Sequence, residues 1–254
     1  MYIYLHVFKT DIPAYGLMIA TGIISANVLA LYLCKKYDLS VNDFIILEAY
    51  SFLGAFAGAK LLYLLLSQSM IQWNRIFEID YLNQLMRGGF VFYGGLIGSL
   101  LFIFIGSKVH HINALPYVQK FIFLIPWIHA FGRIGCFLAG CCYGIPYKGF
   151  LSVVYPENSL APSGIKLFPI QLIEAFFLML IAIILYFGKP SQDKCFTLKL
   201  YLILYSILRF ITEYFRSDSV RGKFLYFSTS QWISVLLLIS IVIYIHMTSD
   251  IQKK

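Results

Sequence analysis

A chain of 254 residues with 60% hydrophobic and only 13% charged residues is too apolar for an ordinary soluble domain, since about a quarter of the residues in such domains are charged. Its formal net charge of +8 is spread over the connections rather than gathered in one stripe. This pattern argues against nucleic-acid binding and fits contact with anionic lipid surfaces.

Seven apolar runs predict membrane-spanning helices, joined by polar connections. We therefore expect an all-α polytopic membrane protein with about seven transmembrane helices. The first run lacks the basic start and small-residue cleavage site of a signal peptide, so it should remain in the protein as a helix. No repeat or linker marks a second part, which predicts a single transmembrane domain over residues 1–254. The spans are expected at residues 12–33, 44–66, 88–107, 121–142, 168–187, 196–215 and 230–246.

The basic residues of the connections bear on the orientation in the membrane. Nine fall on one side and eight on the other, so their number alone does not decide. The nine are all lysines, and most lie on short connectors. Short connectors on the cytoplasmic side of a membrane protein are enriched in lysine and arginine, so this side is assigned to the cytoplasm. We therefore expect the N-terminus outside and the C-terminus in the cytoplasm. The nine are Lys35, Lys36, Lys108, Lys120, Lys189, Lys194, Lys199, Lys253 and Lys254, and the eight are Lys9, Arg75, Arg87, Lys148, Lys166, Arg216, Arg221 and Lys223.

Ionisable side chains inside the spans are the first candidates for function, since such groups are costly in a bilayer and are usually paired or functional. In YSILRFITEYFR, Tyr205, Arg209 and Glu213 recur every four residues, and Arg216 follows three residues later. The spacing predicts that one helical face carries a tyrosine, two guanidinium groups and a carboxylate. An alternative is that Arg209 and Glu213 only pair with each other to lower the cost of insertion.

Positive charge exceeds negative charge among these candidates. A surplus of guanidinium groups in an apolar setting predicts an external anion, and phosphate fits because its oxygens match the guanidinium fork. Gln171 and Glu174 in PIQLIEA lie three residues apart and should share a helical face, and His129 and Glu48 are further polar residues of the spans. The cations counted are Lys60, Arg133, Arg209 and Arg216, and the carboxylates are Glu174 and Glu213.

Two glycine-rich stretches, RGGFVFYGGLIG and GRIGCFLAGCCYG, interrupt the apolar runs. Small residues let membrane helices approach closely, which accounts for a spacing such as Gly94 to Gly98. Around Arg133, flanked by Gly132 and Gly135, the pattern instead predicts a broken or exposed backbone that lines a polar cavity and approaches a ligand.

Seven segments of the chain resemble the prolipoprotein diacylglyceryl transferase family of bacterial inner-membrane enzymes, and they follow one another in the same order as in the family. GGFVFYGGLIG is similar to the family's HGGLIG region, HAFGRIGCFLAGCCYG to its GRIGNFxNxE signature, and RFITEYFR to its RFxxEFFR segment. PAYGLM, GAKLLY, FPIQLIEA and TSQWIS resemble further segments, with Lys60 in place of an arginine in GAKLLY.

The resemblance implies transfer of diacylglyceryl from phosphatidylglycerol to the lipobox cysteine in the signal-peptide segment of a prolipoprotein, forming a thioether in the bacterial plasma (inner) membrane. It implies that Arg133 and Arg209 hold the phosphodiester and that Glu213 orients Arg209 or Arg216. It implies no cofactor and no metal ion. By the same resemblance Tyr93 occupies a catalytic position, and the substrate-binding residues are Tyr15, Lys60, Gly94, Gly95, Gly135, Gln171, Glu174, Tyr205 and Arg216.

The departures from the family pattern fall on the proton-handling part of the site. Tyr93 stands where the family has histidine, and a phenol with a pKa near 10 is a poorer base at neutral pH than an imidazole near 6.5. Cys136 and Ala139 replace two asparagines, and Cys141 replaces a glutamate. Two alternatives therefore stand beside transfer to a prolipoprotein: a related transferase with another acceptor, and a non-catalytic lipid-binding or transport protein.

The chain has five cysteines, an odd number that excludes complete pairing within the chain. Cys34 and Cys195 are expected to be small buried apolar residues. Cys136, Cys141 and Cys142 admit four interpretations: packing residues around the glycines, a disulfide, a transient covalent carrier, or ligands of a metal ion. A membrane thiol–disulfide protein centred on them is the remaining functional alternative.

Overall fold

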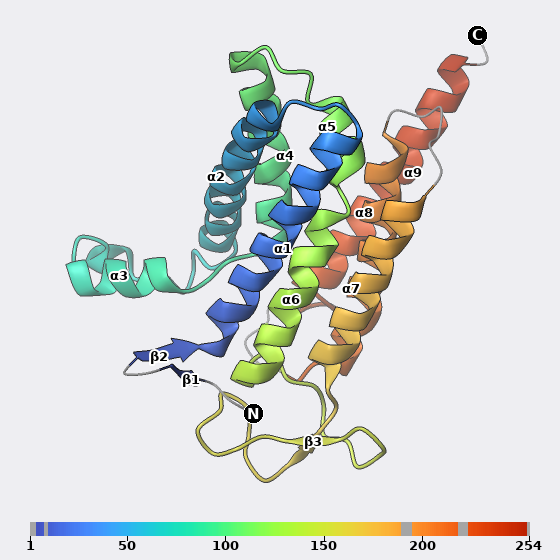
Figure 1. The fold of residues 1–254 in the computed structure, drawn as a ribbon. Coiled ribbons are helices and arrows are strands. Elements are labelled where there is room, and N and C mark those ends of the chain that lie inside the picture. The colour runs from blue at the N-terminus through green and yellow to red at the C-terminus, as the bar shows by residue number, and fades with distance from the viewer. Residues whose placement is uncertain (1–3, 8–9, 189–194, 218–222, 253–254) are drawn as a thin grey trace. The chain divides into compact units, whose positions relative to one another are not determined.

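The computed structural model describes residues 4–7, 10–188, 195–217 and 223–252, and most of them are helical. The chain divides into two compact units (Figure 1). One unit comprises Met1–Tyr32 with Val118–Lys254, and the other comprises Leu33–Tyr117.

The helices and strands follow the chain in the order shown in Figure 1. The α-helices are α1 (Ala14–Lys36), α2 (Val41–Leu66), α3 (Ile79–Arg87), α4 (Phe92–Val109), α5 (Leu115–Phe121), α6 (Leu124–Ala139), α7 (Ile170–Phe187), α8 (Phe196–Thr212) and α9 (Thr229–Gln252). The 3-10 helices are η1 (Trp73–Arg75) and η2 (Glu213–Phe215). Three antiparallel hairpins are formed by β1 (Tyr4–Val7) with β2 (Thr10–Pro13), β3 (Val153–Val154) with β4 (Lys166–Leu167), and β5 (Lys223–Phe224) with β6 (Phe227–Ser228).

Five described helices, α1, α2, α4, α7 and α9, are long and apolar enough to cross a bilayer. A sixth span results if α5 and α6, which meet at an angle of 43°, count as one. Helix α8 covers the predicted span at 196–215 with 17 residues, slightly fewer than the roughly 20 that a bilayer requires. The polytopic, mostly helical class is thereby confirmed. The number of seven spans and the orientation stay predictions.

Helix α6 ends three residues earlier than predicted. Gly140 has φ = 73°, and its N–H bonds back to the carbonyl of Phe137 at 3.3 Å. A glycine in this left-handed conformation is a common way to end a helix. Cys141 and Cys142 therefore lie in the following loop and not in the span.

The connection between α2 and α4, predicted as a loop, contains η1 and α3. The side chains of Phe77 and Ile79 are largely exposed, at 94% and 76%. A nine-residue helix with its apolar residues on one side gives no span-length signal in the sequence, which is why it was missed.

In the unit Leu33–Tyr117, α2 and α4 pack through glycines. A Cβ atom on Gly54 or Gly98 would overlap the facing backbone carbonyl, and Gly58 and Gly94 face each other in the same way. Two helices can approach this closely only where side chains are absent. The structure thus gives Gly94 and Gly98 a packing role.

In the other unit, α6 packs on α7, α7 on α8, and α8 on α9, and Figure 1 shows these helices side by side. The long loop after α6 folds back on the end of η2. Ile145 N–H donates to the carbonyl of Phe215 at 3.0 Å, and Ser217 N–H donates to that of Tyr143 at 3.1 Å. This pairing fixes Arg216 beside the loop that carries Cys141 and Cys142.

Several charged residues behind the predicted orientation lie outside the described residues. They are Lys9, Lys189, Lys194, Arg221, Lys253 and Lys254.

Candidate functional site

One buried carboxylate joins the arginines of three chain segments. Glu174 lies in the second turn of α7, and its side chain is 4% exposed. Its Oε2 lies 2.8 Å from Arg133 Nε on α6, and its Oε1 lies 3.1 Å from Arg209 Nη1 on α8. Arg216 Nη1, just after η2, lies 3.8 Å from the same Oε1. The guanidinium groups that the sequence singled out therefore converge on one point.

Arg209 has a second carboxylate partner on its own helical face. Its Nη2 lies 2.6 Å from Glu213 Oε2 and donates to Ser230 Oγ at 3.3 Å. The spacing of four residues does bring Arg209 and Glu213 together, as the simple pairing alternative required. That alternative is incomplete, because Arg209 is also held by Glu174 of another helix.

Three guanidinium groups and two carboxylates meet in this cluster. Within the described residues, the guanidinium groups of Arg133, Arg209 and Arg216 lie against the carboxylates of Glu174 and Glu213. All these side chains are at least 87% buried. Charges buried to this extent are stable only where they are paired.

Aromatic residues form one wall of the cluster. The rings of Tyr205 and His129 lie 5.6 Å apart, and Tyr205 stacks on Tyr201 at 5.9 Å. A cavity of about 10 Å³, lined among others by His129, Arg133, Glu174 and Tyr205, has room for about one water molecule. This cavity is smaller than a phosphodiester group.

Gln171 connects α7 to the loop after α6. Its fully buried side chain donates from Nε2 to the carbonyl of Cys141 at 2.8 Å and to the hydroxyl of Tyr155 at 3.1 Å. Burial raises the pKa of Tyr155 to about 12, so the phenol stays protonated at neutral pH. Gln171 thus positions the loop rather than pointing into the arginine cluster.

Tyr15 and Gly135 lie in contact where α1 passes α6. A Cβ on Gly135 would lie 3.0 Å from Tyr15 Cδ2 and 3.2 Å from Tyr15 Cα. Tyr15 remains 42% exposed. The broken backbone predicted around Arg133 is not found: α6 runs unbroken from Leu124 to Ala139, and Gly135 serves the close approach of α1. Gly132 differs, because a Cβ there would meet nothing within 4 Å.

Four predicted site residues belong to the other compact unit, where the structure gives them local partners. Lys60 Nζ donates to the carbonyls of Leu85 and Gly88 and so holds the end of α3. Tyr93 is buried near the start of α4, and a Cβ on Gly95 would lie 3.2 Å from the carbonyl of Ala55. Substrate contacts of Lys60, Tyr93, Gly94 and Gly95 stay predictions.

The sequence reasoning missed Ser230 and Tyr155. Ser230 lies in TSQWIS, which resembles a family segment, but a serine near the start of a span carries no charge signal. Tyr155 lies in a loop without periodicity, and only the fold brings it to Gln171.

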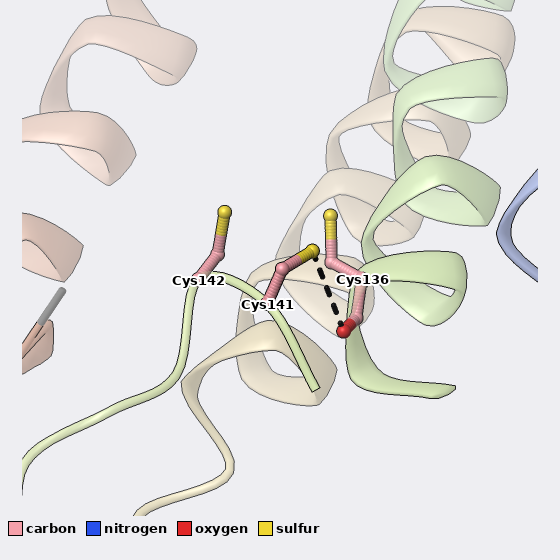
Figure 2. Close-up of side chains that lie close together, drawn as sticks. All are labelled: Cys136, Cys141 and Cys142. Atoms are coloured by element: carbon pink, nitrogen blue, oxygen red, sulfur yellow. Dashed lines mark hydrogen bonds between the residues drawn. The ribbon is translucent and has the colours of Figure 1, made fainter. Parts of the chain in front are cut away.

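Three thiols lie together beside this site. Cys136 in the last turn of α6 and Cys141 and Cys142 in the following loop have their Sγ atoms all within 4.8 Å of one another (Figure 2). All five cysteines lie within the described residues, and no disulfide joins any two of them. Cys34 is fully buried, as expected, whereas Cys195 is only half-buried.

Comparisons with known proteins agree on one family. The family model described as prolipoprotein diacylglyceryl transferase matches residues 2–247. The chain is 33% identical over 235 residues to a protein of Clostridium perfringens named phosphatidylglycerol–prolipoprotein diacylglyceryl transferase 2, covering 92% of this chain and 90% of the relative.

Two further relatives carry the same name without the number. One from Clostridium tetani is 32% identical over 233 residues, with 91% of each chain covered. One from Fervidobacterium nodosum is 31% identical over 243 residues, covering 91% of this chain and 79% of the relative. The matches extend over both compact units and include every segment that forms the arginine cluster. The chain belongs to the prolipoprotein diacylglyceryl transferase family.

Proposed function

We propose that this protein transfers the diacylglyceryl group of phosphatidylglycerol to the lipobox cysteine of a prolipoprotein. Family membership and the names of the relatives support the reaction and both substrates. The single structural observation that carries the proposal is the buried convergence of Arg133, Arg209 and Arg216 on Glu174.

The first task of the site is to bind the lipid phosphate. Arg133 and Arg209 each offer a planar fork of N–H donors that matches phosphate oxygens. On binding, the phosphodiester competes with Glu174 for these donors. Glu213 remains paired with Arg209 and keeps that guanidinium aimed at the substrate.

The second task is to stabilise the leaving group. The acceptor sulfur attacks the diacylglyceryl carbon that bears the phosphate ester, a C–S bond forms, and the C–O bond breaks. The bonding electrons leave with glycerol phosphate, whose negative charge grows in the transition state. Guanidinium groups that are already in place stabilise that charge without reorganisation, and Arg216 adds to the same field.

The remaining residues position the substrates. Tyr205 forms the cavity wall beside Arg133, and Gln171 fixes the loop that carries the cysteines. Tyr15 is exposed enough to contact the headgroup. Lys60, Gly94 and Gly95 are proposed to bind substrate, and Tyr93 occupies the family's catalytic histidine position.

The protein is proposed to cross the bacterial plasma (inner) membrane seven times, with its N-terminus outside and its C-terminus in the cytoplasm. The signal-peptide segment of the prolipoprotein enters from the bilayer, which holds the donor lipid as well.

Transfer is tested with purified protein in vesicles that contain phosphatidylglycerol, by mass spectrometry of an added lipobox peptide. We expect the peptide to gain the mass of one diacylglyceryl group, and the same peptide with serine for cysteine to stay unchanged. Retention of the lipid without any product would identify a lipid-binding protein and contradict the proposal.

Arginine variants test the cluster itself. Arg133→Gln and Arg209→Gln should lower the transfer rate by about 100-fold or more, the usual effect of removing a preorganised donor from developing charge. Arg75→Gln is the matched control, because Arg75 pairs with Glu78 on the exposed surface. Equal transfer rates in all three variants would show that the arginine cluster does not take part in catalysis.

A further inference from the structure

The three neighbouring thiols form a group that the proposed reaction has not used. Cys136 is buried, while Cys141 and Cys142 are half-buried. Their Sγ atoms lie within 4.8 Å of one another and come from two adjoining segments (Figure 2). A group that is partly accessible and made only of soft donor atoms has the composition of a metal site.

The backbone holds this group in place. Gly140 has φ = 73° and reverses the chain, so that Cys141 N–H bonds to the carbonyl of Cys136 at 3.1 Å. Cys141 Sγ lies 3.7 Å from the same carbonyl oxygen, the contact dashed in Figure 2. Gln171 fixes the carbonyl of Cys141 from α7.

The backbone of Cys142 has a conformation that is unusual for a residue other than glycine. Its φ of 56° is in the left-handed region, which a residue with a Cβ atom seldom enters. Such conformations persist where the surroundings enforce them, and they gather at functional positions.

The dimensions suit a single ion. Zinc binds thiolates at about 2.3 Å, which places the sulfur atoms of a tetrahedral site about 3.8 Å apart. The observed separations of at most 4.8 Å reach that value by small side-chain rotations. Three protein ligands leave the fourth tetrahedral position open, as in catalytic zinc sites.

The surrounding charges favour such an ion in its thiolate-bound form. Three thiolates and one divalent cation carry a net charge of −1. Arg133 interacts electrostatically with Cys136 and Cys142, and Arg216 interacts with Cys142.

We infer that Cys136, Cys141 and Cys142 bind a thiophilic divalent cation of the zinc type, and that the acceptor cysteine of the peptide substrate becomes its fourth ligand. The inference rests on the proposed function. It gives this chain a way to activate the acceptor, because a thiol that coordinates a metal ion loses its proton. A histidine base at the position of Tyr93 is then not required.

The reaction balances with the cation unchanged. The acceptor thiol releases its proton on coordination, and its sulfur lone pair forms the C–S bond to the diacylglyceryl carbon. The C–O bond to phosphate breaks, and its electron pair leaves with glycerol phosphate. The released proton ends on the phosphate oxygen of that product, and the thioether dissociates from the cation.

Cobalt(II) tests the metal site without the reaction. Reduced, metal-free protein in detergent is titrated with the ion, and the thiolate-to-cobalt charge-transfer absorption is recorded. We expect one ion per chain. Cys142→Ser and Cys141→Ser should each weaken binding by more than the 10- to 100-fold that loss of an outer-shell partner causes. Cys195→Ser, with its half-buried thiol outside the group, should bind like the wild type.

The acceptor position is tested by adding peptide to the cobalt-loaded protein. A lipobox peptide with cysteine should strengthen the charge-transfer absorption, and the same peptide with serine should not. Absence of cobalt binding, binding unaffected by both loop variants, or no spectral response to the cysteine peptide would each overturn the inference. A disulfide within the group, with no cobalt uptake after its reduction, would also overturn it.

Transfer assays separate this inference from the proposed function. If the metal-free protein and Cys142→Ser form product as fast as the zinc-loaded wild type, the inference is wrong and the proposed function stands. If the loaded wild type binds cobalt and peptide as expected but forms no product from phosphatidylglycerol, the proposed function is wrong. Both are supported if the zinc-loaded wild type forms product at least 100-fold faster than Cys142→Ser and than the metal-free protein, while zinc-loaded Cys195→Ser forms product at the wild-type rate.

Discussion

At the scale of single residues, Glu174 decides how the cluster is built. The spacing of Tyr205, Arg209 and Glu213 allowed their common face to be predicted, since helical periodicity is a local property. That Glu174 would hold arginines from three segments could not be predicted, because the packing of α7 between α6 and α8 decides it. The sequence indicated several cations within the spans, and the structure brings three of them, Arg133, Arg209 and Arg216, to one carboxylate.

Replacing Glu174 should therefore affect stability more than replacing Glu213. Glu174→Gln removes the carboxylate that lies 2.8 Å from Arg133 Nε, and breaking a buried ion pair by removing one partner costs about 3–5 kcal/mol. Glu213→Gln removes one partner of Arg209 while Glu174 remains. Thermal unfolding in detergent measures both, and equal destabilisation would contradict the central role of Glu174.

Tyr93 offers a second prediction at this scale. In protein freed of metal by a chelator, Tyr93→His should raise the transfer rate near neutral pH, because an imidazole with a pKa near 6.5 accepts a proton more readily than a phenol. The pH–rate profile should gain a rising limb near that pKa, and Tyr93→Phe serves as the control. A profile identical to that of the wild type would show that the proton leaves elsewhere.

At the scale of elements, the positions of the long helices were predictable and their ends were not. Each expected span contains a helix, since long apolar runs are a strong signal. The end of α6 depends on Gly140, and α3 is too short to be recognised as an element of its own. The glycines around Arg133 were interpreted as a broken backbone, whereas Gly135 in fact serves contact with Tyr15.

Glycines at helix contacts and glycines at the site should respond differently to alanine. Gly98→Ala places a Cβ against the carbonyl of Gly54, and overpacking of this kind costs about 1–3 kcal/mol. Gly132→Ala meets no neighbour within 4 Å and should stabilise α6 by about 0.5–1 kcal/mol.

Transfer kinetics complete this comparison. If Gly132 is kept small for the approach of the lipid, Gly132→Ala should raise KM for phosphatidylglycerol in spite of its greater stability. Unchanged kinetics in Gly132→Ala would assign this glycine no role in substrate approach, and an unfolding temperature of Gly98→Ala equal to that of the wild type would contradict the packing argument.

At the scale of the whole molecule, α8 decides the topology. Counting the bent pair α5 and α6 as one, six spans among the described residues are long enough by themselves, and an even number of crossings would return both termini to one side. Helix α8 has 17 residues and ends in η2, where Glu213 and Arg216 belong to the buried cluster. If α8 crosses the membrane as well, the number of spans is odd and the termini lie on opposite sides.

Reporter fusions measure this directly. A fluorescent protein fused after Lys254 should fold in the cytoplasm and fluoresce, and alkaline phosphatase fused at the same point should be inactive. The same reporters placed in the connection after α2, near Gln68, should give the opposite pair of results, because that connection is expected outside. The short lysine-bearing connectors support this orientation, and α8 tolerates its charged end because Arg209 and Glu213 are paired within the protein. An active phosphatase after Lys254 would mean that one of the proposed spans does not cross the membrane. Helix α8 would then be the first candidate, because its 17 residues make it the shortest proposed span that consists of a single helix.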